Sequence, residues 1–106
     1  GIIGLGYVGL PLTLAFSKKR FVVAFDKDNQ RINELKKGKD RNNEFKKELK
    51  RKNRNIEFTG KSEALSKCNI FIVTVPTPVN KKNLPDLRYL KEACKTVGRR
   101  CKSFNY

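Results

Sequence analysis

Short apolar runs alternate along this chain with longer polar segments in which apolar residues recur at helical spacing. Four runs have the length and the β-branched or aromatic content of strands: residues 1–3, 21–25, 56–59 and 70–75. Helical spacing occurs at residues 7–19, 29–37 and 86–100, with a helical turn at 63–66. Strands that alternate with helices predict an α/β fold with a parallel sheet.

The apolar spacing also predicts which face of each helix is buried. In 7–19 the expected face carries Val8, Leu12, Ala15 and Phe16. In 29–37 it carries Ile32 and Leu35, with Gly38 as the stop. In 86–100 it carries Leu87, Leu90, Ala93, Cys94 and Val97. Phe45 and Leu49 are four residues apart, which favours a further short helix in the charged middle of the chain.

The chain is short, with 106 residues and no Met, and it opens inside a predicted strand. We therefore expect one incomplete domain over residues 1–106, truncated at both ends. No apolar run has the ~18–20 residues that a transmembrane helix needs. The first apolar stretch is glycine-rich and has no basic segment before it, unlike a signal peptide, so we expect a cytoplasmic protein that is not bound to a membrane.

Charge and cysteine content limit the classes of function. The net charge of +15 would attract polyanions, so a basic nucleic-acid-binding module is one interpretation. The lysine runs lack interleaved aromatic residues, which favours a merely lysine-rich protein without a specific nucleic-acid partner. Three cysteines without a C-x-x-C pair, and no His, support neither a zinc site nor a disulfide framework.

Residues 4–9 form the pattern G-x-G-x-x-G, between a predicted strand and a predicted helix. Gly4 permits a tight turn, Gly6 lets the backbone approach a diphosphate, and Gly9 lets the helix pack close to the sheet. The amides around Tyr7 and Val8 then face the phosphates at the positive end of the helix. A glycine-rich turn with a purely structural role is the alternative.

Asp26 closes the second strand, 17 residues beyond Gly9. A carboxylate there can accept both hydroxyls of the adenosine ribose and repel a 2′-phosphate, so the predicted cofactor is NAD rather than NADP. The alternative is a helix cap, but Asp28 is better placed for that role. Arg31 lies one turn into the helix, where it either reaches the ribose or adenine or is a solvated surface arginine.

The sheet order expected for this pattern is 3-2-1-4, the order of a Rossmann-type domain with flanking helices. In that order the first and fourth strands are neighbours, and a ligand crevice opens at their carboxyl ends. Pro76, Thr77 and Pro78 would form the wall opposite the glycine turn, with Thr77 offering a hydroxyl and an amide. An ordinary proline-rich loop is the alternative.

Several motifs in this order resemble the NAD-binding domain of the nucleotide-sugar dehydrogenases, the UDP-glucose/GDP-mannose dehydrogenase family. They are GLGYVGLPL, FVVAFD, RINEL, IVTVPTPV and PDLRYL. The last two are more similar to the UDP-N-acetylhexosamine 6-dehydrogenases of polysaccharide synthesis than to the UDP-glucose branch. The resemblance implies NAD contacts at Leu5, Gly6, Tyr7, Val8, Asp26, Arg31, Pro76 and Thr77.

The resemblance also implies an activity for the complete enzyme. Such enzymes oxidise the C6 alcohol of a UDP-sugar to a carboxylate with NAD, through a covalent intermediate on a cysteine assisted by Lys, Asn and Asp. Those catalytic residues belong to later segments, so no catalytic residue is expected here, and a homodimer is expected only for the full-length enzyme. Cys68, Cys94 and Cys101 do not match the glycine-flanked nucleophile motif, and Cys68 and Cys94 are expected to be packing residues.

Two competing interpretations remain at this stage. A β-hydroxyacid dehydrogenase would share the glycine turn and topology but not the Tyr7-Val8 and Pro76-Thr77-Pro78 pair. A nucleic-acid module would show binding that falls steeply with salt whatever the ligand. Because the predicted sheet exposes an apolar edge, we also expect marginal folding or aggregation of the isolated chain.

Overall fold

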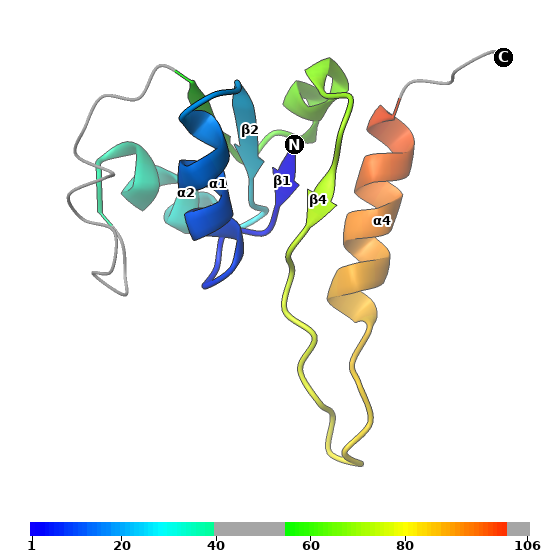
Figure 1. Ribbon diagram of the computed structural model, residues 1–106. Coiled ribbons are helices and arrows are strands. Elements are labelled where there is room, and N and C mark those ends of the chain that lie inside the picture. The colour runs from blue at the N-terminus through cyan, green and yellow to red at the C-terminus, as the bar shows by residue number, and fades with distance from the viewer. Residues whose placement is uncertain (40–54, 102–106) are drawn as a thin grey trace, which may run out of the picture.

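The computed structural model describes residues 1–39 and 55–101, and the helix predicted around Phe45 and Leu49 lies outside these ranges. The strands are β1 (Ile2–Ile3), β2 (Val22–Phe25), β3 (Ile56–Thr59) and β4 (Ile72–Val73). The helices are α1 (Gly9–Ser17), α2 (Asn29–Lys36), the 3-10 helix η1 (Ser62–Lys67) and α4 (Arg88–Arg100). Figure 1 shows the helices grouped around the small sheet.

All four strands are parallel and lie in the order β3-β2-β1-β4, which confirms the predicted Rossmann-type topology. β1 occupies the centre, with Ile2 opposite both Ala24 and Ile72. β2 pairs along its whole length with β3. The chain therefore reverses its direction of winding between β1 and β4, where α/β sheets of this kind bind ligands.

The sheet is covered on both faces, which explains the continuous apolar run in β2. Val22 and Ala24 belong to the cluster formed with Leu10 of α1 and Ile32 of α2. Val23 and Phe25 belong to the opposite cluster. That second cluster contains Leu65 of η1 and Ala93 of α4, so α1 and α2 cover one face and η1 and α4 cover the other.

The predicted buried face of α1 is wrong at three of its four positions, and only Leu12 packs against the core. Val8 and Phe16 are exposed, as is Ala15, and the buried positions are Gly9, Leu10, Thr13 and Ser17. Gly9, Thr13 and Ser17 recur every four residues, so they form a stripe of small side chains along one side of the helix. The two hydroxyls bond within the helix. That of Thr13 donates to the Gly9 carbonyl at 2.8 Å, and that of Ser17 donates to the Leu14 carbonyl at 2.8 Å. The small side chains bring α1 close to the sheet.

Several predicted boundaries shift by one or two residues. α1 runs over Gly9–Ser17 instead of 7–19 because the chain still turns through Tyr7 and Val8. β4 keeps regular pairing only at Ile72–Val73, and β2 begins after an exposed Phe21. α2 ends at Lys36, and α4 begins at Arg88. The inward positions Ile32 and Leu35 and the left-handed Gly38 after α2 are confirmed.

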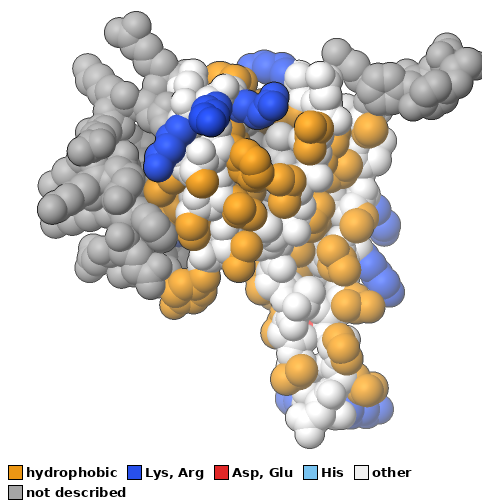
Figure 2. Space-filling view, viewed as in Figure 1, with side chains coloured by type: hydrophobic (Ala, Val, Ile, Leu, Met, Phe, Trp, Pro, Cys, Tyr) orange, Lys and Arg blue, Asp and Glu red, His pale blue; other side chains and the backbone are white. Residues whose placement is uncertain are grey.

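The segment between β4 and α4 projects from the body as a narrow arm (Figure 1). Val79 and Pro85 form an antiparallel bridge, and Asn80 caps the turn between them through its side-chain oxygen. Val79 and Leu84 of this arm are exposed apolar residues. Figure 2 shows apolar side chains along the arm. The arm sets the distance between the end of β4 and the start of α4.

The cysteines differ in environment. Cys68 packs against the second core cluster, as expected, whereas Cys94 on α4 is exposed, so its predicted packing role is wrong. Ala93 is the buried residue of that helix because α4 contacts the sheet by a narrow strip. In the described part of the chain, no helix is long and apolar enough to cross a membrane.

Candidate functional site

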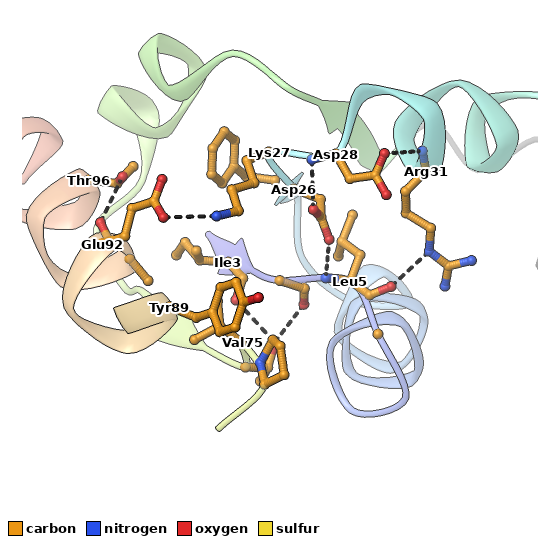
Figure 3. Close-up of a pocket in the computed structure, with 16 residues that line it drawn as sticks. Ile3, Leu5, Asp26, Lys27, Asp28, Arg31, Val75, Tyr89, Glu92 and Thr96 are labelled. Carbon is orange, nitrogen blue, oxygen red and sulfur yellow. Dashed lines mark hydrogen bonds and ion pairs between the residues drawn. The ribbon is translucent and has the colours of Figure 1, made fainter. Parts of the chain in front are cut away.

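A pocket of about 330 Å³ opens at the carboxyl ends of β1, β2 and β4. Its walls come from the turn after β1, the residues after β2, the end of β4 and one side of α4. The lining residues are Ile3, Gly4, Leu5, Gly6, Phe25, Asp26, Lys27, Asp28, Arg31, Thr74, Val75, Pro76, Tyr89, Glu92, Ala93 and Thr96 (Figure 3). A pocket of this volume lies within the range of small-molecule and cofactor sites.

The glycine turn fits between β1 and the end of β4 only because two of its glycines lack a Cβ. Gly4 has a φ of +99°, and a Cβ there would lie 3.0 Å from backbone atoms of Thr74 and Val75. A Cβ on Gly9 would overlap the carbonyl oxygen of Gly4 and lie 2.6 Å from Thr74 Oγ1. The roles predicted for these two glycines, a tight turn and close helix packing, agree with this geometry.

Gly6 and the residues after it present free backbone donors to solvent. A Cβ on Gly6 would meet no atom within 4 Å. Among the described residues, none accepts a hydrogen bond from the amides of Gly6, Tyr7 or Val8. The carbonyl of Gly6 instead accepts from Leu10 at 3.2 Å, which begins the first turn of α1. These amides therefore lie at the positive end of a helix, where anionic groups bind favourably.

Asp26 follows β2 and is held by two backbone amides. Its Oδ2 accepts from the amide of Leu5 at 2.9 Å, and its Oδ1 accepts from the amide of Asp28 at 2.9 Å. Each carboxylate oxygen keeps a further acceptor position, so the fixed carboxylate can still take hydroxyl groups from a ligand. Asp28 is the cap of α2, accepting from the Arg31 amide at 3.2 Å, as predicted.

Arg31 is buried, with 5% of its surface exposed, so the alternative of a solvated surface arginine is wrong. Its Nε donates to the carbonyl oxygen of Leu5 at 3.0 Å. Its side chain also lines the pocket beside Asp26 (Figure 3). Arg31 therefore supports the glycine turn from α2 while it remains beside the candidate ribose position.

The α4 wall was not predicted from the sequence. Lys27 Nζ lies 2.8 Å from Glu92 Oε2 and 5.0 Å from the centre of the Tyr89 ring. The hydrogen bond to Glu92 raises the pKa of Lys27, and the same bond lowers the pKa of Glu92. Thr96, one turn further along α4, lines the same wall. This arrangement links β2 to α4 on the side of the pocket opposite Arg31 (Figure 3).

The remaining predicted contacts are distributed unevenly around this site. Pro76 lines the pocket next to Val75, but Thr77 is exposed and does not contribute to the lining. Tyr7 and Val8 are also exposed and lie beside the pocket on the turn, with their amides available. In the described ranges, no group of three or more His, Cys, Asp or Glu residues could hold a metal ion.

The geometry fits a dinucleotide. Exposed amides at the start of α1 suit a diphosphate, the open space at Gly6 suits its close approach, and the Asp26 carboxylate suits a ribose diol. Gly6 and Asp26 line one pocket at the switch between β1 and β4, and Tyr7 and Val8 follow Gly6 on the turn beside it. The fold and the site define a dinucleotide-binding Rossmann domain.

The sequence matches the UDP-glucose/GDP-mannose dehydrogenase family, NAD binding domain, over residues 1–105. The chain therefore belongs to this family, it corresponds to the NAD-binding domain, and its cofactor is NAD. This membership confirms the resemblance seen in the motifs. It also removes the two competing interpretations, the β-hydroxyacid dehydrogenase and the nucleic-acid module without enzyme ancestry.

Curated relatives are similar over most of this chain. It is 52% identical over 97 residues to a UDP-N-acetyl-D-glucosamine 6-dehydrogenase of Salmonella typhi, and 49% identical over 98 residues to Protein CapL of Staphylococcus aureus. Each match covers 92% of this chain and 23% of the relative. The chain therefore spans about a quarter of the length of these relatives.

Solved structures share the fold. A GDP-mannose dehydrogenase from Pseudomonas aeruginosa superposes with a TM-score of 0.86 at 25% identity, covering 93% of this chain and 24% of that protein. A UDP-glucose dehydrogenase from Pyrobaculum islandicum also gives a TM-score of 0.86, at 27% identity, with 93% and 24% covered. The strand order and flanking helices described above are thus those of nucleotide-sugar dehydrogenases.

Proposed function

We propose that this chain forms the NAD-binding part of a cytoplasmic UDP-sugar 6-dehydrogenase. The substrate would be a UDP-N-acetylhexosamine, with UDP-glucose as the second candidate, and the product the C6 carboxylate. The 52% sequence identity to a UDP-N-acetyl-D-glucosamine 6-dehydrogenase supports a UDP-N-acetylhexosamine as the substrate. Residues 1–106 would hold the cofactor, while the sugar-binding and catalytic groups, and the homodimer contacts, would belong to the complete enzyme.

The observation that carries this proposal is the convergence of a free backbone turn and a fixed carboxylate on one pocket. The amides of Gly6, Tyr7 and Val8 would donate to the diphosphate at the positive end of α1. Asp26 would accept the ribose hydroxyls with the acceptor positions that Leu5 and Asp28 leave open. A 2′-phosphate would bring two negative groups together there, which favours NAD over NADP.

The other predicted contacts have supporting roles. Gly4 and Gly9 would shape the turn, and the Leu5 peptide would link it to Asp26 and Arg31. Pro76 would close the pocket on the β4 side. Thr77 is exposed outside the pocket, so it would contact only a part of the cofactor that extends beyond the pocket. Bound NAD supplies the hydride acceptor for alcohol oxidation. The chain's own residues would bind and orient this acceptor without catalysing a step.

Calorimetric titration of the chain with NAD and NADP tests this proposal. The wild type should bind NAD and discriminate against NADP, and Asp26→Ala should weaken NAD binding by roughly tenfold because the diol loses a charge-assisted acceptor. Asp86→Asn is the matched control, since Asp86 lies on the arm outside the pocket and pairs with Arg88. Equal losses in the two variants would contradict the proposal.

Salt dependence separates specific binding from charge attraction. A chain of charge +15 can hold any anion weakly, and such binding falls steeply when salt rises from about 50 to about 300 mM. NAD binding through the pocket should lose only a few-fold over that range, because backbone amides and a carboxylate make most of the contacts. An absence of NAD binding by the wild type would overturn the proposed function itself.

A further inference from the structure

One peptide unit of the glycine turn is held at both ends by side chains from two other strands. The hydroxyl of Thr74, just after β4, donates to the carbonyl oxygen of Gly4 at 2.7 Å. The amide of Leu5 donates to Asp26 Oδ2, just after β2, at 2.9 Å. The Gly4 carbonyl and the Leu5 amide belong to the same planar peptide, so these two contacts fix its orientation.

The following peptide is fixed as well. Arg31 Nε, from α2, donates to the carbonyl of Leu5 at 3.0 Å. Two successive peptide planes, Gly4–Leu5 and Leu5–Gly6, are thus oriented by side chains of three separate elements. The amide of Gly6 belongs to the second of these planes, so Arg31 orients it directly, and the amide of Tyr7 follows in the next plane.

Thr74 lies where the end of β4 closely approaches the turn. A Cβ on Gly9 would lie 2.6 Å from Thr74 Oγ1, and a Cβ on Gly4 would lie 3.0 Å from the Thr74 backbone. The Thr74 amide donates to the Ile3 carbonyl at 2.8 Å, and its hydroxyl lies farther from that carbonyl, at 3.3 Å, than from Gly4. The hydroxyl therefore reaches beyond the regular β1–β4 pairing and bonds to the turn itself.

We propose that Thr74 is a positioning residue for the diphosphate-binding turn. Its hydroxyl sets the Gly4–Leu5 peptide plane, directly before the plane that carries the Gly6 amide, and so helps to direct the amides of Gly6 to Val8 toward the diphosphate. Through the same peptide, Thr74 is connected to Asp26, so it supports the diphosphate and ribose positions together. This inference rests on the proposed function, because it assigns a residue to the same NAD site.

Thr74→Val tests the role, because valine keeps the shape of threonine and removes the hydrogen bond. The dissociation constants of NAD and ADP should rise about three- to tenfold, the cost of one lost hydrogen bond. The dissociation constant of adenosine, which lacks a diphosphate, should change less than about twofold. Thr74→Ser keeps the hydroxyl, so its dissociation constant for ADP should stay near the wild-type value.

A control and a ligand-free measurement complete the test. Thr59→Val is the matched control, since Thr59 ends β3 at the opposite edge of the sheet and accepts from the Lys61 amide at 3.0 Å, outside the pocket. In hydrogen exchange without ligand, the Leu5 amide should exchange faster in Thr74→Val than in the wild type or Thr59→Val, because a loosened peptide plane weakens its bond to Asp26.

The possible outcomes separate this inference from the proposed function. Unchanged ADP binding in Thr74→Val, equal loss of ADP and adenosine binding, or failure of Thr74→Ser to restore ADP binding would each overturn the positioning role. Loss of all ligand binding through unfolding would count against it as well, since Thr74 would then be a packing residue. If the wild type binds no NAD, the proposed function fails, while the exchange of the Leu5 amide still decides whether Thr74 orders the turn.

Discussion

The ammonium group of Lys27 lies 2.8 Å from the carboxylate of Glu92, so the end of β2 is joined to α4 beside the cofactor pocket. The side chains are 56% and 59% exposed, so solvent screens the pair and its contribution to folding is small. The Tyr89 ring lies 5.0 Å from the same ammonium. Together these contacts connect the residue that follows Asp26 to the first turns of α4.

The Glu92 carboxylate should make this joint sensitive to acid. The hydrogen bond from Lys27 lowers the pKa of Glu92 below its ordinary value of 4.5, so the pair stabilises the fold above that value. The contribution should be lost as the pH falls through the lowered pKa of the folded state. For Lys27 the pKa is raised above 10.5, so its contribution is complete below that value and is lost only in strong alkali.

Urea denaturation of the wild type and Glu92→Gln from about pH 6 to about pH 3 measures this effect. The midpoint of the wild type should exceed that of Glu92→Gln near pH 6, and the difference should shrink toward pH 3. The hydrogen bond from Arg88 lowers the pKa of Asp86 to about 2. Protonation of Asp86 in acid therefore affects the stability of both proteins equally. A difference that stays constant with pH would contradict the role of the carboxylate.

Two glycines of the turn should respond in opposite ways to a single methyl group. Gly9→Ala should lower the free energy of unfolding by about 1–3 kcal/mol, because the new Cβ overlaps the Gly4 carbonyl oxygen. Gly6→Ala should leave the melting temperature unchanged, because no atom lies within 4 Å of its Cβ, but should weaken NAD binding. Thermal melts and NAD titration of both variants check this contrast, and equal melting temperatures would contradict it.

Arg31 should contribute to stability before any ligand binds. Arg31→Met removes the donor to the Leu5 carbonyl and should destabilise the fold by roughly 1–3 kcal/mol. Lys36→Met is the matched control, since Lys36 is an exposed cation on the same helix. Chemical denaturation of both variants without NAD measures the difference, and a similar effect of the two changes would show that the buried contact is unimportant.

The isolated chain should associate through the side of the sheet near β4. In the described part of the chain, β4 pairs only with β1, and Ile70 just before it is 69% exposed. Ile70→Lys should reduce self-association because a charge beside an open strand edge opposes edge pairing. Val79→Lys, a similarly exposed position on the arm, should have little effect. Light scattering over a concentration series compares the two variants with the wild type.

The strand order was predictable because strands alternate with helices around the glycine turn, which is the pattern of a Rossmann-type sheet. The glycine turn and Asp26 were predictable for a related reason, since turn chemistry depends on residue type at fixed spacing. The buried face of α1 was not predictable from apolar periodicity, because Gly9, Thr13 and Ser17 carry no hydrophobic signal and yet form the contact. Close approach of the backbones along this stripe adds to the apolar contact that Leu10 makes with the core.

The α4 wall and Thr74 could not be found by local patterns. Tyr89 and Glu92 reach the pocket only because the arm after β4 returns the chain at a particular distance and angle. Thr74 belongs to a β-branched run that reads simply as a strand, and its bond to Gly4 spans 70 positions of sequence. The burial of Arg31 likewise depends on the position of the Leu5 carbonyl, which is set by the sheet.

Because small residues set how closely α1 packs on the sheet, a substitution at the far end of the helix changes the affinity for the cofactor. Ser17 is buried against the body, more than two turns along the chain from the amides that would meet the diphosphate. A bulkier residue at Ser17 would lift that end of the helix and tilt the rigid rod about its contact near Gly9. Adaptive change in cofactor affinity could therefore arise at Ser17 without any substitution among the groups that touch the ligand.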